Sequence, residues 1–312
     1  MKIEFPNQQK SELLEEAKKW FFVCKKKLEG FFAKNNFLAA FNKLGSKELG
    51  SRTLYGFLLT LASILFIFTA SALPHLFRLA CAVFALWQLK ELRQMSPFAS
   101  LPKRLWVVIE AGIVVFLIWG PISQLFCAAL VMALCATSAI YYGYNISQLS
   151  LALFAFIYFA LPLGSILQLN ELSGVWRPSQ RQGWLIAALL IPKIYDIGAY
   201  FTGKALGKNL LAPELSPNKT VEGVFGGAAF STLALAVLQG FCALFSSQQL
   251  LLSFLAVPLL AQFGDLFESW IKRSAGARHS GVIPGLGGVM DLSDAITWCA
   301  PYFLYLSLGG FR

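Results

Sequence analysis

Acidic, hydroxyl and basic side chains recur at helical spacing in the C-terminal third of the chain. Intervals of three and four residues separate four of them, Asp265, Glu268, Ser269 and Lys272. On an α-helix, this spacing places all four side chains on one face. The preceding residues, 250–261, are apolar, so the face lies near the end of a helix that can enter a bilayer. Charged groups are costly there unless they face protein, water or a ligand, and the pattern therefore indicates a functional site.

A glycine-rich stretch follows this helix and ends at two further carboxylates. It contains Gly287 and Gly288, and it closes with Asp291 and Asp294. Backbone without side chains can approach an anion closely. Mg²⁺ prefers a few carboxylates together with phosphate oxygens over a complete protein cage. We therefore predict a phosphate and metal site in which Asp265, Asp291 and Asp294 are the metal ligands.

A second polar cluster begins within an earlier apolar run. The spacing of Lys193, Asp196 and Tyr200 places these side chains on one helical face. A lysine and an aspartate one turn apart in a membrane can bind a ligand together. They can also serve only to neutralise each other, and the pair by itself leaves both interpretations open.

The loop beyond this run carries groups suited to a polyphosphate. It contains Ser216, Lys219 and Thr220, and Glu222 stands where the next helix is expected to begin. Hydroxyl groups, an ammonium group and the N–H groups at a helix N-terminus all bind phosphate. The loop is not a Walker A motif, because the chain contains no GxxxxGKS or GxxxxGKT sequence. Arg273, at the end of the first cluster, adds a further cation for phosphate.

The composition indicates that these residues are held in a membrane scaffold. Hydrophobic residues make up 57% of the chain and charged residues 13%, well outside the average of soluble domains. Runs of about 18 apolar residues can cross roughly 30 Å of hydrocarbon, and helices satisfy their own backbone there. We expect an all-α polytopic membrane protein of about nine transmembrane helices, with a cytoplasm-facing polar cleft in its C-terminal half. The six cysteines lie mostly in apolar runs without a CxxC pair, so they are predicted to be packing residues.

Three regions follow from this pattern. Residues 1–52 form a basic amphipathic cytoplasmic segment, which suits either a helix on the membrane surface or a solvated tail. Residues 53–182 hold the N-terminal transmembrane helices, and residues 183–312 hold the C-terminal catalytic transmembrane region. The apolar runs cover approximately residues 54–72, 76–89, 105–119, 125–142, 149–169, 184–201, 223–245, 250–271 and 295–308.

The net charge of +10 has an explanation that does not involve nucleic acid. Basic residues that flank membrane helices orient them toward the cytoplasm and attract the headgroups of anionic membrane lipids. With a cytoplasmic N-terminus, the loops after the second, fourth, sixth and eighth runs share its side, and they carry most of the basic residues. Every candidate catalytic segment then lies on that face. We expect an integral, multi-pass protein of a bacterial-type inner membrane, with its active site and N-terminus cytoplasmic.

Three ordered motifs of the C-terminal region resemble the phosphatidate cytidylyltransferase (CDP-diacylglycerol synthase) family. The first is D-I-G-A-Y-F-T-G-K and the second is S-P-N-K-T-V-E-G-V-F-G-G. The third is S-x-x-K-R, followed by P-G-x-G-G-x-x-D-x-x-D. The resemblance is dense from Lys193 to Asp294, and the occurrence of all three motifs in order makes it specific. The earlier helices match only in number and character.

The resemblance implies an enzyme that joins CTP and phosphatidate, giving CDP-diacylglycerol and pyrophosphate. It implies Mg²⁺, with or without a second cation, and a homodimer. By this resemblance the metal is held by Asp265 and Asp291. The residues taken as catalytic are Lys272, Arg273, Asp265 and Asp291. Those taken as substrate-binding are Asp196, Ser216, Lys219, Thr220, Glu222, Ser269, Gly287 and Gly288.

This chemistry agrees with the residue types. A phosphatidate oxygen is already anionic at neutral pH, so the reaction requires no strong general base. It requires charge neutralisation and in-line alignment at the α-phosphorus of CTP, which a metal ion and basic side chains provide. A helix end at the cytoplasmic surface lets a water-soluble nucleotide meet a lipid headgroup.

The chain departs from the family pattern at three places. Arg278 and His279 stand where the family usually has Lys-Asp, so an imidazole, a weak ligand for Mg²⁺, replaces a carboxylate. Leu286 replaces a histidine, and Leu292 replaces an arginine. These changes leave the metal-carboxylate positions intact. They motivate an alternative, a catalytically impaired paralogue that binds lipid and nucleotide without turnover.

A third interpretation is an ion-coupled membrane transporter, because carboxylates in membranes also mark ion pathways. A transporter predicts charges near the middle of the bilayer in two matching halves. In this sequence the charges gather at helix ends in the C-terminal third, and no internal repeat is found. The enzyme is therefore favoured over the transporter.

Overall fold

The structure is a computed structural model, and it describes residues 73–118, 121–171, 178–277 and 288–311. Several predictions concern residues outside these ranges. They are the amphipathic segment 1–52, the apolar run 54–72, and the positions of Arg278, His279, Leu286 and Gly287.

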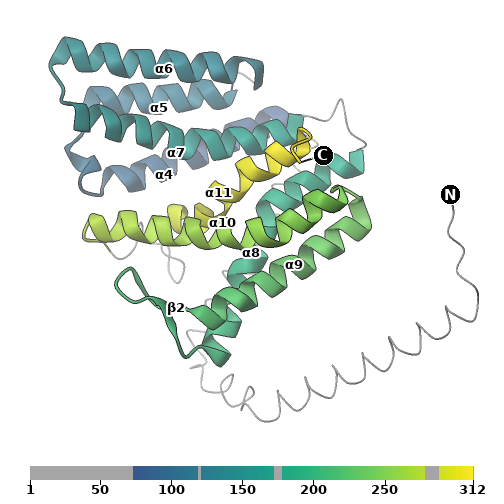
Figure 1. Cartoon of the computed structure of the whole chain (residues 1–312). Helices are drawn as coiled ribbons and strands as arrows, with labels where there is room; N and C mark the ends of the chain where they lie inside the picture. Colours follow the sequence, from purple (N-terminus) through teal and green to yellow (C-terminus); the bar gives the residue numbers. More distant parts are fainter. Residues whose placement is uncertain (1–72, 119–120, 172–177, 278–287, 312) are drawn as a thin grey trace, which may run out of the picture. The chain divides into compact units, whose positions relative to one another are not determined.

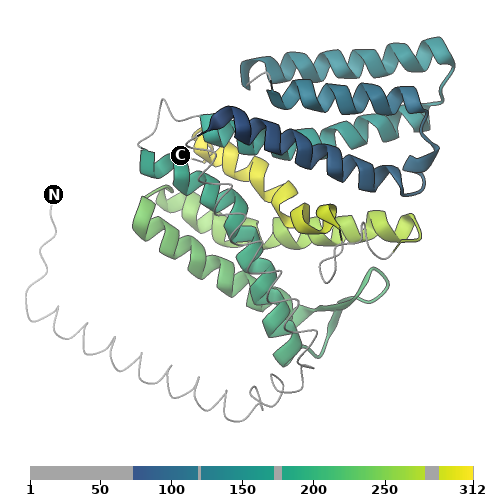
Figure 2. The same ribbon diagram turned by 180° about the vertical axis from the view of Figure 1, so that it is seen from behind.

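Eight α-helices and one short β-hairpin make up the described part of the chain (Figures 1 and 2). The first four helices are α4 (Pro74–Arg93), α5 (Lys103–Ile118), α6 (Pro121–Tyr142) and α7 (Ile146–Glu171), and a 3₁₀ turn, η1 (Phe98–Ser100), separates α4 from α5. The last four are α8 (Pro178–Leu206), α9 (Val221–Cys242), α10 (Ser247–Ser274) and α11 (Val289–Ser307). Each of these helices coincides with one of the predicted apolar runs.

Four of these helices are long and apolar enough to cross a membrane. They are α7, the segment Gln182–Leu206 of α8, α9 and α10. Large apolar side chains on α9 and α10 point outward: Phe225 is 72% exposed, Phe241 is 85% exposed and Leu251 is 71% exposed. Side chains of this kind are suited to hydrocarbon rather than water. The prediction of a helical membrane protein is therefore confirmed.

A β-hairpin takes the place of the loop expected between α8 and α9. Strand β1 (Leu210–Ala212) pairs with β2 (Ser216–Thr220) in antiparallel register, with Leu210 opposite Thr220. The hairpin leads directly into α9, because the Thr220 hydroxyl caps that helix by accepting a hydrogen bond from the Gly223 N–H at 3.1 Å. The residues expected to bind phosphate are thereby held on a strand.

Helix α11 contacts both groups of helices, α4 and α7 of the first group and α8 and α10 of the second (Figures 1 and 2). A glycine permits its close approach to α10. A Cβ atom added at Gly264 would lie 2.8 Å from Trp298 Cδ1 and would clash with the Asp294 carbonyl oxygen. Small residues at helix crossings let backbones approach each other within membranes. The crossing at Gly264 therefore brings Asp265 next to the first half of α11.

Candidate metal and phosphate site

The first sequence cluster lies on one face of α10, as its spacing predicts. Glu268, Ser269 and Lys272 are buried, with 1%, 8% and 8% of their surfaces exposed. The Lys272 Nζ donates to Glu268 Oε2 at 3.1 Å, one helical turn away. Asp265, one turn before Glu268, is partly exposed. This polar face of α10 is thus turned into the protein and away from lipid.

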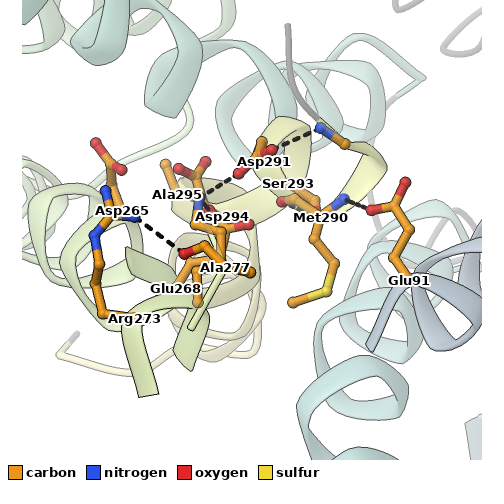
Figure 3. A network of polar contacts seen from close by, with 12 residues as sticks. Glu91, Asp265, Glu268, Arg273, Ala277, Met290, Asp291, Ser293, Asp294 and Ala295 are labelled. Carbon is orange, nitrogen blue, oxygen red and sulfur yellow. Dashed lines mark hydrogen bonds and ion pairs between the residues drawn. The ribbon is translucent and has the colours of Figure 1, made fainter. Parts of the chain in front are cut away.

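Three carboxylates from α10 and α11 come together beside this face (Figure 3). Asp265, Glu268 and Asp294 each offer one oxygen, and these oxygens lie within 4.8 Å of one another. Glu268 Oε1 is buried and has no hydrogen-bond partner among the described residues. A buried carboxylate oxygen without a donor is costly unless a cation approaches it. The three side chains therefore fit a divalent metal ion, for which carboxylate oxygens are suitable ligands.

Asp291, another acid of the predicted metal set, takes a different position. It forms an ion pair with Lys272, which also binds Glu268, and its Oδ2 accepts a hydrogen bond from the Gly288 N–H at 2.6 Å. Asp291 lies outside the four helical segments that are long and apolar enough to cross a membrane. Burial raises the pKa of Asp291, but Lys272 and the Gly288 N–H outweigh burial, so the pKa lies below its usual value. Asp291 is thus an ionised neighbour of Glu268, and Lys272 binds both carboxylates.

The second cluster reaches the same acidic group from α8. The Lys193 Nζ lies 2.7 Å from Asp196 Oδ2 and 3.3 Å from Asp294 Oδ1. The lysine therefore does more than neutralise the aspartate one turn away, because it also links α8 to α11. Tyr200, which shares the predicted face, is 41% exposed, and its hydroxyl accepts a hydrogen bond from Lys204 at 3.4 Å.

Strand β2 supplies a third lysine, and Arg273 ties the hairpin to α10. Lys219 forms an ion pair with Asp265. The Arg273 Nε donates to the Leu215 carbonyl at 3.1 Å, and its Nη1 donates to the Ala277 carbonyl at 3.0 Å (Figure 3). Arg273, predicted to contact phosphate, thus connects the turn of the hairpin to the C-terminal end of α10.

Glu222 and Thr220, both predicted to bind substrate, make contacts that shape the hairpin and the start of α9. The Glu222 carboxylate accepts hydrogen bonds from the Lys208 N–H at 3.1 Å, from the Asn209 N–H at 3.3 Å and from Asn209 Nδ2 at 2.9 Å. Thr220 caps α9. Ser216 begins the same strand and is partly exposed. Hydrogen bonds of Glu222 and Thr220 therefore hold the predicted phosphate-binding loop in the conformation of a hairpin.

Among the described residues, the ion pairs of the site contain more acidic than basic groups. The ion pairs, together with the group of three carboxylates formed by Asp265, Glu268 and Asp294, join five carboxylates with three ammonium groups. The acids are Asp196, Asp265, Glu268, Asp291 and Asp294, and the bases are Lys193, Lys219 and Lys272. When all these groups are ionised, the five carboxylates exceed the three ammonium groups by two charges, which one divalent cation balances.

Two side chains of α4 contact the start of α11, and the sequence analysis did not predict them. The Glu91 carboxylate accepts hydrogen bonds from the Val289 N–H at 2.9 Å and the Met290 N–H at 3.0 Å (Figure 3). Gln88 Nε2 donates to the Ser293 hydroxyl. One signal in the sequence points to Glu91: an acid in the last turn of a helix opposes the helix dipole and calls for a partner elsewhere.

Comparisons with known proteins agree with the resemblance. A sequence model of the cytidylyltransferase family matches residues 50–308. The chain is similar to a phosphatidate cytidylyltransferase of Staphylococcus epidermidis, with 41% identity over 120 residues, which are 38% of this chain and 46% of that protein. A phosphatidate cytidylyltransferase of Bacillus subtilis is 42% identical over 113 residues, 36% of this chain and 42% of the relative.

A longer match is found with a phosphatidate cytidylyltransferase of Staphylococcus aureus. It is 32% identical over 231 residues, which cover 70% of this chain and 85% of that protein. The matches to the Staphylococcus epidermidis and Bacillus subtilis proteins span less than half of the length of those relatives.

Proposed function

Because this chain belongs to the cytidylyltransferase family, we propose that it transfers CMP from CTP to phosphatidate in phospholipid biosynthesis. The products of this reaction are CDP-diacylglycerol and pyrophosphate. The observation that supports the proposal is the group of five carboxylates and three lysines drawn from α8, β2, α10 and α11. Such a group suits a nucleotide polyphosphate that is held by a divalent cation and by ammonium groups.

Mg²⁺ is the cation that these ligands favour. Asp265, Glu268 and Asp294 would hold it, and Asp291 shares Lys272 with Glu268. When bound, Mg²⁺ would neutralise charge on the phosphate oxygens of CTP and make the α-phosphorus more electrophilic. Any second cation would share these carboxylates.

In this proposal, Lys219 and Lys272 bind phosphate groups of the nucleotide. Lys219 lies against Asp265, and Lys272 lies against Asp291, so each ammonium group is held in place by a carboxylate of the site. A phosphate oxygen can share such an ammonium group, and charge-assisted hydrogen bonds of this kind are strong. Arg273 keeps the hairpin with Lys219 at the end of α10.

The reaction depends on alignment and charge neutralisation. An anionic phosphatidate oxygen attacks the α-phosphorus of CTP and forms a new oxygen–phosphorus bond. The bond from the α-phosphorus to the bridging oxygen of the β-phosphate breaks, and pyrophosphate leaves with the electron pair. The lysines stabilise negative charge on the attacking and leaving oxygens. Burial of Glu268, Lys272 and Asp294 limits the access of water, which would compete as a nucleophile.

The membrane arrangement belongs to the same proposal. The chain crosses a bacterial-type inner membrane with about nine helices, and its N-terminus and a polar cleft in the C-terminal half face the cytoplasm. CTP reaches the cleft from the cytoplasm, and phosphatidate reaches it from the surrounding membrane lipids. The homodimer implied by the family resemblance is tested by light scattering of the purified protein in detergent.

The experiment that tests the reaction uses the purified full chain in mixed micelles that contain phosphatidate. CTP labelled in its α-phosphate is added together with Mg²⁺. We expect label to appear in CDP-diacylglycerol, accompanied by an equal amount of pyrophosphate, and EDTA should stop both. Asp265→Asn should lower turnover by about 100-fold or more, because the cation that would stabilise charge in the transition state loses one of its ligands.

A matched control is Glu110→Gln. Glu110 pairs with Arg93 at 3.4 Å in a half-exposed position outside the acidic group, so this variant should retain full turnover. Labelled nucleotide that binds without product from the wild type would favour the catalytically impaired alternative. Turnover that Asp265→Asn leaves unchanged would contradict the assignment of the site.

A further inference from the structure

The helices before α8 contain none of the three family motifs, yet α4 holds the start of α11 through two buried side chains. We infer that Glu91 and Gln88 are positioning residues, which fix where Asp291 and Asp294 lie relative to α10. The inference rests on the proposed function, because those two carboxylates belong to the site assigned to the reaction.

Glu91 serves as an N-terminal cap supplied by a distant helix. The first N–H groups of an α-helix have no partner within it, and the N-cap residue of α11, Gly288, has no side chain to accept them. Glu91 Oε1 accepts from the Val289 N–H at 2.9 Å, and Oε2 accepts from the Met290 N–H at 3.0 Å. Both carboxylate oxygens are therefore engaged in charge-assisted hydrogen bonds, which are stronger than neutral ones.

The negative charge of Glu91 is stabilised by the N-terminus of α11 and not by its own helix, α4. Glu91 lies in the last turn of α4, where the helix dipole disfavours an acid, and it is only 6% exposed. The ion pairs found among the described residues do not include it. At the N-terminus of α11 the helix dipole favours negative charge, so this contact offsets the free-energy cost of burying the Glu91 carboxylate.

Gln88 makes a second contact further along α11. It lies one turn before Glu91, is 2% exposed, and donates from Nε2 to the Ser293 hydroxyl. Ser293 is itself buried and stands between the two carboxylates of the site in sequence. Contacts at the first turn and at Ser293 oppose both a shift of α11 along its axis and a rotation about it. Either motion would move Asp291 away from Lys272.

The test compares Glu91→Gln and Gln88→Met with the wild type, each as purified full chain in detergent. Mn²⁺ binding is followed by the EPR signal of the free ion, and CDP-diacylglycerol formation is measured over a range of Mg²⁺ concentrations. We expect Glu91→Gln to lower the maximal rate roughly ten- to 100-fold, as a small misplacement of catalytic groups does. The variant should also weaken Mn²⁺ binding and raise the Mg²⁺ concentration that gives half of the maximal rate.

The matched control is again Glu110→Gln, which removes one carboxylate charge from the neighbouring helix α5 and should leave all three quantities unchanged. If Glu91→Gln lowers the melting temperature but leaves the Mn²⁺ affinity and the Mg²⁺ dependence unchanged, Glu91 has only a structural role and the inference is overturned. If Glu91→Gln does not fold, Gln88→Met decides, because it removes only the donor to Ser293. Mn²⁺ affinity and rates equal to those of Glu110→Gln would then overturn the inference.

Failure of the inference and failure of the proposed function are distinguishable. An active wild type whose α4 variants match Glu110→Gln contradicts only the positioning role. A wild type that binds Mn²⁺ but forms no CDP-diacylglycerol contradicts the proposed reaction, and weakened Mn²⁺ binding in Glu91→Gln would then still support the positioning role.

Discussion

Lys272 and Lys193 each bridge two carboxylates. Lys272 binds Glu268 on its own helix and Asp291 on α11, while Lys193 binds Asp196 on its own helix and Asp294 on α11. Removal of either ammonium group would leave two partly or fully buried acids without their partner, which costs more than the loss of a surface pair. At the scale of residues, the site is therefore a set of coupled charges rather than of independent ligands.

The first prediction distinguishes the two acids that share Lys272. Glu268→Gln should weaken Mn²⁺ binding by about ten-fold or more, because Glu268 belongs to the group of three carboxylate oxygens within 4.8 Å. Asp291→Asn should weaken it less, since Asp291 is not one of the three acids whose oxygens lie within 4.8 Å of one another. Titration of both variants with Mn²⁺, followed by EPR, gives the comparison. A larger loss of Mn²⁺ affinity in Asp291→Asn than in Glu268→Gln would indicate that Asp291 is the more important metal ligand of the two.

The second prediction concerns Lys193. Lys193→Met should lower the free energy of unfolding by about 1–3 kcal/mol, because it leaves Asp196 and Asp294 without their ammonium partner. Adding Asp196→Asn should restore the part of this stability that is lost at Asp196 in a double-mutant cycle. Turnover should stay low in the double variant, since Asp294 still lacks its ammonium group. Thermal unfolding in detergent and the CTP assay provide the two measurements. Recovery of both stability and turnover would mean that Lys193 serves only to neutralise Asp196.

At the scale of elements, two arrangements bring the charged residues together. The hairpin is braced at its start by Glu222 and at its turn by Arg273, so that Lys219 of β2 meets Asp265 of α10. The second arrangement is the crossing of α10 and α11 at Gly264, where a side chain would push Asp294 away. Neither arrangement is visible in the periodicity of one helix.

The third prediction tests the helix crossing. Gly264→Ala should destabilise the protein by about 1–3 kcal/mol, because the new methyl group overpacks against the Asp294 backbone and Trp298. It should also reduce turnover, since Asp265 and Asp294 would be forced apart. Gly240→Ala on α9 is the matched control, because a Cβ at that position meets nothing within 4 Å. Equal melting temperatures and rates for the two variants would argue against the close crossing.

At the scale of the whole molecule, the charged groups of the site come from segments far apart in the chain. Lys193 and Asp294 are 101 residues apart, and Glu91 and Val289 are 198 residues apart. The hydrogen bonds of Glu91 place the C-terminal end of α4 beside the N-terminal end of α11. The positive-inside pattern assigns the same two ends to one side of the membrane. The geometry and the charge pattern therefore agree.

The fourth prediction concerns orientation. Glu214, in the turn of the hairpin, and Gln248, in the first turn of α10, are both exposed and lie beyond opposite ends of α9. A membrane-impermeant maleimide applied to intact bacteria should label Gln248→Cys and should label Glu214→Cys only after the cells are opened. Both variants are made in a chain without Cys24 and Cys242. Labelling of Glu214→Cys in intact cells would reverse the proposed orientation.

The helices and the polar faces of the site could be predicted from the amino-acid sequence alone. Apolar runs predicted each described helix, because a backbone in lipid must satisfy its own hydrogen bonds. The helical period placed Glu268 with Lys272 and Lys193 with Asp196, and both pairs are in contact. These features depend on residues within one or two turns of each other, so they can be read along the chain.

Which acids lie close enough to share one cation, and which contacts hold them there, depends on the tertiary structure. It grouped Glu268 with Asp265 and Asp294, joined Asp291 to Lys272, and showed that Glu91 caps a helix 198 residues away. These relations depend on how closely and at what level separate helices cross, and packing contacts such as the one at Gly264 set that geometry. Local spacing carries no information about such crossings, because they arise between residues that are distant in the chain.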